Sequence, residues 1–72
     1  MLKLIVVEPL AQGWAVRHEE GGVSQVFKSG AKAEAAARHL GTRLALAGIA
    51  AEIRVYLRDG ALAGRFLCPA MA

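Results

Sequence analysis

An alanine-rich stretch at residues 31–48, AKAEAAARHLGTRLALAG, constrains the fold most strongly, because only this part of the chain has the composition of a long helix. Its apolar residues recur at the three-and-four spacing of one helical face, and its charged residues lie elsewhere on the cylinder. The predicted buried face consists of Ala33, Ala37, Leu40, Leu44 and Ala47. Because small side chains allow close approach, this face is suited to packing on strands that supply the bulky residues.

The ends and the middle of this helix carry further local features. Ser29 or Gly30 is expected to cap its N-terminus, and Glu34 is expected in the first turn, where the helix dipole favours a carboxylate. Glu34 also stands four residues before Arg38, which allows an ion pair. Gly41 lies inside the helix, where glycine costs about 1 kcal/mol relative to alanine. We therefore expect Gly41 to mark a close approach between the helix and a strand.

Most segments that flank the helix alternate apolar and polar residues, as strands do. The first has apolar residues on both alternations after Lys3, as in a strand that is covered on both sides or shared with a partner. The segments cover residues 2–7, 14–19, 23–28, 52–58 and 61–67. The first is expected to end at Glu8-Pro9, because proline cannot donate to a ladder. The elements are therefore expected in the order β-β-β-α-β-β, which indicates the α+β class, with one helix packed on an antiparallel sheet.

Two glycine-containing turns predict how neighbouring strands pair. If Gly21-Gly22 is a two-residue hairpin loop, Val16 faces Phe27 across the ladder. If Asp59-Gly60 is another, the pairs of the last two strands are Leu57 with Leu62, Val55 with Gly64, Ile53 with Phe66, and Arg54 with Arg65.

The 72 residues (1–72) form a single domain whose core is small. Chains below about 70–80 residues often need a disulfide, a metal or a partner subunit. The single cysteine, Cys68, rules out an internal disulfide, and 56% of the residues are hydrophobic. We therefore expect a homodimer, held together by apolar residues that a monomer cannot obviously bury: Ile5, Val7, Leu46 and the tail at residues 67–71.

Charge and hydropathy favour a soluble protein of the cytoplasm. The apolar run that follows Lys3 is too short for a signal peptide, and charged residues interrupt every stretch that approaches the length of a membrane span. The net charge of +3 and the pI near 9.6 permit an acidic partner without requiring one.

The sequence carries no catalytic or metal-binding pattern. His18, His39 and Cys68 lack the close spacing of metal ligands, so no metal and no other cofactor is expected. The hydroxyl side chains have no nucleophile motif around them, and the glycines do not form a phosphate loop. We therefore expect no enzymatic activity, and no small-molecule substrate is identifiable.

The sheet face that points away from the helix gives an alternative function. The predicted strands gather arginines around one aromatic ring there, as in surfaces that neutralise phosphates while a ring stacks on a base. This alternative nucleic-acid site consists of Arg17, Arg54, Tyr56, Arg58 and Arg65, with Lys28 at its margin. Glu19 and Glu52 dilute its charge, so a solvated or self-associating face is the first expectation.

Short motifs at residues 14–62 resemble those of a known family. They are Trp14-x-Val16, Gly21-Gly22, Phe27, Lys32-Ala33-Glu34-Ala35, Glu52-Ile53-x-Val55 and Arg58-Asp59-Gly60. Together they resemble a small bacterial domain of unknown function with a W-x-V strand, a T-K-x-E-A helix start and an R-D-G hairpin. Ala31 stands where that family has threonine, so the usual capping box with Glu34 is absent. The resemblance implies a bacterial protein and brings no activity, cofactor or catalytic residue.

Overall fold

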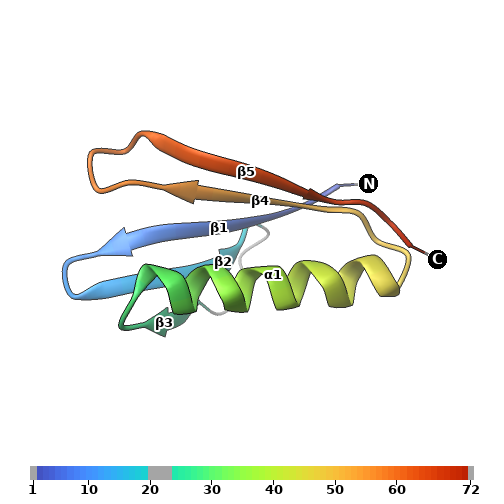
Figure 1. Ribbon diagram of the computed structural model, residues 1–72, viewed down its shortest axis with the longest axis horizontal. Coiled ribbons are helices and arrows are strands. Elements are labelled where there is room, and N and C mark those ends of the chain that lie inside the picture. The colour runs from blue at the N-terminus through green and yellow to red at the C-terminus, as the bar shows by residue number, and fades with distance from the viewer. Residues whose placement is uncertain (1, 20–23, 72) are drawn as a thin grey trace.

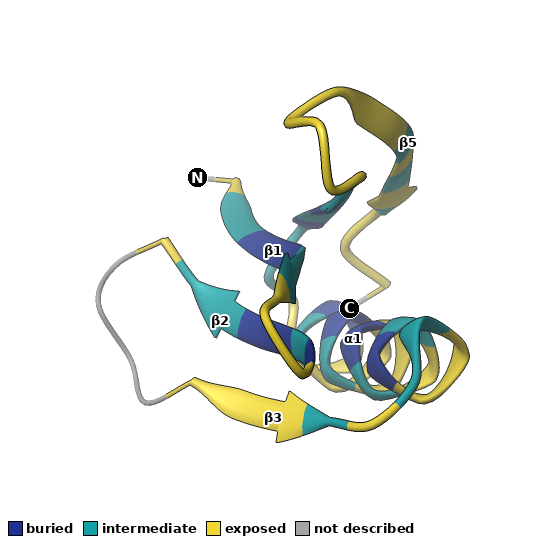
Figure 2. Ribbon diagram, turned by 90° about the vertical axis from the view of Figure 1, so that its left-hand side faces the viewer, coloured by how far each residue is buried: buried dark blue, intermediate teal, exposed yellow. Residues whose placement is uncertain are grey.

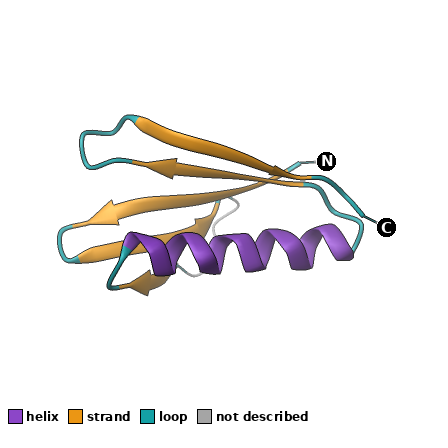
Figure 3. Cartoon of the chain, viewed as in Figure 1, coloured by secondary structure: helices purple, strands orange, loops and turns teal. Residues whose placement is uncertain are grey.

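The computed structural model describes residues 2–19 and 24–71 and confirms the α+β class, with one helix packed on a five-stranded sheet (Figure 1; Figure 3). The elements follow the predicted order along the chain. They are β1 (Lys3–Leu10), β2 (Gly13–His18), β3 (Gln25–Phe27), α1 (Gly30–Leu46), β4 (Ala51–Tyr56) and β5 (Leu62–Cys68).

The sheet is mixed, which corrects the prediction of a purely antiparallel one. The spatial order is β3-β2-β1-β4-β5, and β1 pairs in parallel with β4 while all other neighbours are antiparallel. The physical reason lies in α1. A helix long enough to cross the sheet returns the chain to run in the same direction as before, so β3 and β4 become parallel strands of one sheet.

β1 forms the middle of the sheet and of the core. Ile5 and Val7 are fully buried, and Val6 on the other face is 5% exposed. The expectation that a monomer cannot bury Ile5 and Val7 is therefore wrong, because neighbouring strands and α1 surround them (Figure 2). Apolar residues on both alternations of this strand reflect its central position.

β1 also runs past the proline that was expected to end it. Pro9 pairs with Trp14 of β2, and the strand continues to Leu10. The register between β1 and β4 ends at Val7 and Val55. Pro9 therefore has a ladder on one side only, which is the edge position where a missing N–H is tolerated.

The N-terminus of α1 confirms one of the two expected caps. Ser29 is the N-cap, and its Oγ accepts a hydrogen bond of 3.1 Å from the N–H of Lys32. The expected role of Glu34 at the helix dipole is wrong, because with Ser29 as the N-cap Glu34 is the fifth residue of α1 and lies beyond the first turn. Glu34 instead forms the predicted ion pair with Arg38, at 3.0 Å.

The buried face of α1 is narrower than the spacing of its leucines indicates. Its fully buried residues are Ala33, Ala37, Gly41 and Ala45. Leu40 and Leu44 flank this stripe as half-buried residues, and Ala47 is the exposed C-cap. The smallest side chains thus form the line of closest contact, which lets the helix axis lie close to the strands.

Gly41 confirms the expected close approach and leads to a stability prediction. A Cβ at this position would lie 2.7 Å from the Sγ of Cys68 and 3.4 Å from the Cδ1 of Ile53. We expect Gly41→Ala to lower the free energy of unfolding, because overpacking costs about 1–3 kcal/mol. This cost exceeds the gain of about 1 kcal/mol from replacing a helical glycine.

Removing the sulfur should reverse the sign of this effect. In a Cys68→Ala background the nearest remaining atom of residue 68 lies 3.6 Å away, an ordinary contact. Gly41→Ala is then expected to stabilise the protein by up to about 1 kcal/mol. Urea melts measure the free energy of unfolding of four proteins: the native protein, the two single variants and the double variant. If Gly41→Ala stabilised the native background, a methyl group would fit between α1 and Cys68, and the expected overpacking would be wrong.

The observed register of β4 and β5 agrees with most of the predicted pairs. Three pairs of β4 and β5 are confirmed: Val55 with Gly64, Ile53 with Phe66, and Arg54 with Arg65. The predicted pair of Leu57 with Leu62 is wrong, because a bulge pairs Leu62 with Tyr56 instead. The loop spans residues 58–60, and a hydrogen bond of 2.8 Å from the N–H of Leu57 to the carbonyl of Ala61 closes it. Gly60, at φ +87°, supplies the left-handed residue that such a three-residue loop needs.

The register of β2 and β3 is two residues away from the predicted one. Trp14 faces Phe27 and Val16 faces Gln25. A shift of two keeps every side chain on its predicted face, because side chains alternate along a strand. The Gly21-Gly22 turn from which the register was predicted lies outside the described residues.

Candidate interaction surface

The helix covers one face of the sheet, and no helix in residues 2–19 and 24–71 lies over the opposite face, here called the outer face (Figure 2). Side chains of alternate residues on paired strands make it up. From the registers its members are Leu4, Val6, Glu8, Ala15, Arg17, Val26, Glu52, Arg54, Tyr56, Leu62, Arg65 and Leu67. The face is therefore apolar at several points and carries charges of both signs.

Three of the four arginines predicted for the nucleic-acid site lie in one row across the outer face. Val6 pairs with Arg17 on one side and with Arg54 on the other, and Arg54 faces Arg65. Tyr56 lies two residues along β4 from Arg54, on the same face. The structure thus brings together Arg17, Arg54, Tyr56 and Arg65.

Glutamates neutralise two of these arginines. The Nε of Arg17 donates to Oε1 of Glu8 at 2.9 Å, and the Nε of Arg54 donates to Oε2 of Glu52 at 2.6 Å. These hydrogen bonds are the main reason why the pKa of each arginine is raised above its ordinary value. Among the described residues only Arg65 of this row has no ion-pair partner. Arg65 is therefore the one arginine of the row that keeps the uncompensated charge from which the nucleic-acid site was predicted.

Arg58 lies apart from this row, in the loop between β4 and β5. It donates a hydrogen bond of 2.6 Å to the carbonyl of Leu10, and its guanidinium lies 5.7 Å from the centre of the Trp14 ring. Arg58 thus links the loop between β4 and β5 to the end of β1 and the start of β2. Lys28, predicted at the margin of the site, follows β3 and is exposed.

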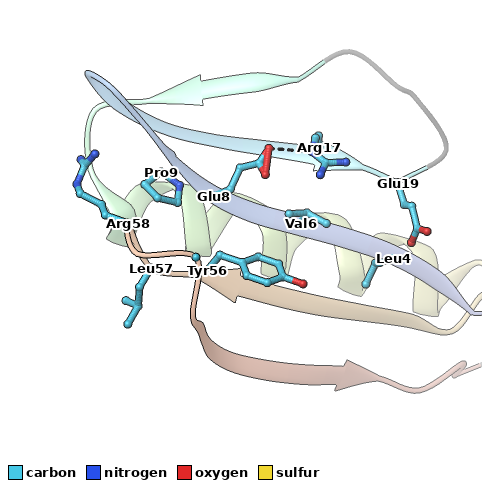
Figure 4. Close-up of a pocket in the computed structure, with 10 residues that line it drawn as sticks. Leu4, Val6, Glu8, Pro9, Arg17, Glu19, Tyr56, Leu57 and Arg58 are labelled. Carbon is cyan, nitrogen blue, oxygen red and sulfur yellow. Dashed lines mark hydrogen bonds and ion pairs between the residues drawn. The ribbon is translucent and has the colours of Figure 1, made fainter.

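A shallow hollow of about 490 Å³ opens on the outer face (Figure 4). Leu4 and Val6 of β1 lie across its centre, the ion pair of Arg17 and Glu8 lies on one side, and the ring of Tyr56 lies on the other. Its described lining combines apolar side chains with the phenol of Tyr56, the closed ion pair, and the further charged side chains of Glu19 and Arg58.

The two edges of the sheet differ in how well they are protected. β3 is an edge strand of only three residues, which is one common way to blunt an edge. β5 is an edge strand of seven residues that contains neither lysine nor proline, and its Leu62 and Leu67 are 46% and 64% exposed. Sequence reasoning missed this edge because it left the strand order open.

Comparisons with known proteins give no match, whether with family models, curated proteins or solved structures. The resemblance to the small bacterial domain therefore stays a prediction. In residues 2–19 and 24–71 no helix is long and apolar enough to cross a membrane. Across the same residues, no three side chains of His, Cys, Asp or Glu gather where they could hold a metal ion.

Proposed function

We propose that this protein is a non-enzymatic interaction module of the bacterial cytoplasm, and that it acts as a homodimer whose two copies join along β5. The observation that carries this proposal is the long edge strand β5, seven residues without lysine or proline, in which Leu62 and Leu67 are exposed. Such an edge presents unpaired backbone N–H and C=O groups that template pairing with another strand. A second copy offers the same strand at the same concentration.

The symmetry of a homodimer restricts how the two β5 strands meet. A two-fold axis makes a strand pair with itself antiparallel, so the sheet would continue across the interface. Registers that place the two Arg65 side chains directly opposite each other are disfavoured, because like charges face to face destabilise a ladder. In the remaining registers the exposed side chain of Leu67 contacts the second copy on the outer face. Its apolar surface is removed from water there, and this stabilises the dimer in addition to the backbone hydrogen bonds.

Two leucines of nearly equal exposure allow a matched test of this interface. Leu67 lies on β5 and is 64% exposed, whereas Leu46 lies at the end of α1 and is 60% exposed. We expect Leu67→Lys to weaken dimerisation by at least about tenfold, because an edge lysine opposes strand pairing and an apolar contact is lost. Leu46→Lys, the same change on the helix, should leave the dimer intact. Size-exclusion chromatography with light scattering measures both.

Dilution gives a second measurement. The melting temperature of the native protein is expected to fall on dilution, since dissociation removes binding energy from the folded state. Leu67→Lys should melt at a temperature that does not depend on concentration. A monomeric mass for the native protein at micromolar concentration would overturn the proposal, and dissociation by Leu46→Lys instead would move the interface to α1.

Nucleic-acid binding by the outer face stays a prediction, favoured by Arg65, which lies beside Arg54 and has no ion-pair partner among the described residues. The same chromatography with added duplex and single-stranded nucleic acid tests it. A complex that disappears as salt rises would indicate arginine–phosphate contacts.

A further inference from the structure

A second hollow, of about 380 Å³, opens on the helix side of the sheet, between α1 and the ends of β2 and β3. Its apolar floor includes Val16, which is 4% exposed, and the half-buried Leu40. Its polar rim brings together four side chains from three elements: His18, Gln25, His39 and Arg43. The two rim residues from α1 lie four positions apart, so both belong to one side of the helix.

The rim offers hydrogen-bond donors and no carboxylate among the described residues that line the hollow. A guanidinium carries five N–H donors, an amide two, and each imidazole at least one. Glu34 is the only acidic residue of α1, and Arg38 already holds it at 3.0 Å. The rim therefore favours an anion.

Arg43 differs from most arginines of this chain in lacking an acceptor. Arg17, Arg38 and Arg54 each pair with a glutamate, and Arg58 donates to a backbone carbonyl. In the part of the chain that the structure describes, neither Arg43 nor the other three rim side chains has a side-chain hydrogen bond or ion pair. The donors of the rim are therefore available to a ligand.

We propose that this hollow binds a small organic phosphate monoester. Arg43 holds the phosphate through its planar fork, which matches the geometry of phosphate oxygens, and His18, His39 and Gln25 donate to the remaining oxygens. The apolar body of the ligand lies on Val16 and Leu40. The volume lies within the range of small-molecule sites. This site is on the face opposite to the outer face, so it does not rest on the proposed dimer.

Phenyl phosphate is a suitable probe, because it combines the phosphate with an apolar ring. In a titration of the full ¹⁵N-labelled chain followed by NMR, we expect saturable shifts of the amides of Val16, His39, Leu40 and Arg43. Inorganic phosphate and phenol, each supplying half of the ligand, should bind more weakly. Arg43→Gln is expected to weaken phenyl phosphate binding by at least about tenfold, because it removes a charge-assisted hydrogen bond.

Lys32→Gln serves as the matched control. Lys32 is exposed on the same helix, three turns before Arg43, and loses the same single charge. We expect this variant to bind phenyl phosphate as the native protein does, with an unchanged amide spectrum away from the substitution. The proposal is overturned by the absence of saturable shifts up to about 10 mM ligand. Equal weakening by both variants, or shifts centred on Arg54 and Arg65, would overturn it as well.

Discussion

Ile53→Ala is expected to lower the free energy of unfolding by about 2–5 kcal/mol, the usual cost of removing a large apolar side chain from a packed core. Ile53 is completely buried, pairs with Ile5 of β1 and Phe66 of β5, and lies beneath Gly41 of the helix. Its side chain thus joins the helix to three strands. A domain of this size has a total stability of only several kcal/mol, so a large part of the population would unfold.

Urea melts at one fixed protein concentration measure this effect, with Leu46→Ala as the control. Leu46 is 60% exposed, and its truncation should cost less than about 0.5 kcal/mol. Leu40→Ala and Leu44→Ala should fall between these values, because both leucines are half-buried at the margin of the core. If Leu46→Ala destabilised the protein as strongly as Ile53→Ala, the core would not lie between α1 and β4.

Among substitutions that add a single methyl group to the sheet, Gly13→Ala is expected to lower the free energy of unfolding most. Gly13 has φ +137°, and a Cβ there would lie 2.6 Å from the carbonyl oxygen of Phe27. This oxygen belongs to the backbone of β3, which the neighbouring pair of Trp14 and Phe27 holds in register. The backbone strain and the clash together are expected to cost more than about 3 kcal/mol.

Gly60→Ala separates the two contributions. Gly60 has φ +87°, yet nothing lies within 4 Å of the position of its Cβ. Only the backbone cost of about 1–2 kcal/mol applies there. Thermal melts compare the two variants, and the fluorescence of Trp14 reports whether β2 and β3 have separated. Similar losses in both variants would show that the contact between Gly13 and Phe27 contributes little.

Local rules predicted the elements of this fold well. The spacing of Ala33 and Ala37 located the buried side of the helix, and Asp59-Gly60 located the last hairpin. The predicted register was mostly correct for β4 and β5 and wrong for β2 and β3, and the reason is physical. A glycine pair marks a turn without determining the length of its loop, so the pairing of β2 with β3 was wrong by two residues.

The arrangement of the strands follows from long-range packing, which local rules do not describe. The apolar residues of β1 are compatible with a central strand and also with a strand at a subunit interface. The parallel pairing of β1 with β4 decides for the central strand, because it covers the side of β1 that a partner subunit would otherwise cover. The 17 residues of α1 did carry usable information, because a helix of that length between two strands is typical of a parallel crossover.

The candidate surface shows the same division between local and long-range information. The alternation of residues placed Arg17, Arg54, Tyr56 and Arg65 on one face, as predicted. The partners of the arginines were harder to predict. Glu52 stands two residues from Arg54 and was already visible as a diluting charge, whereas Glu8 reaches Arg17 only because β1 and β2 are neighbours.

The parallel pairing of β1 with β4 also has a consequence for how the chain folds. β1, β2 and β3 are connected by short loops, and so are β4 and β5, so each group can assemble from contacts close in sequence. The pair formed by Ile5 and Ile53 instead closes a loop that contains most of the protein. Closing such a loop is slow and entropically costly. A nascent chain therefore keeps one side of β1 unpaired until the residues of β4 have been synthesised.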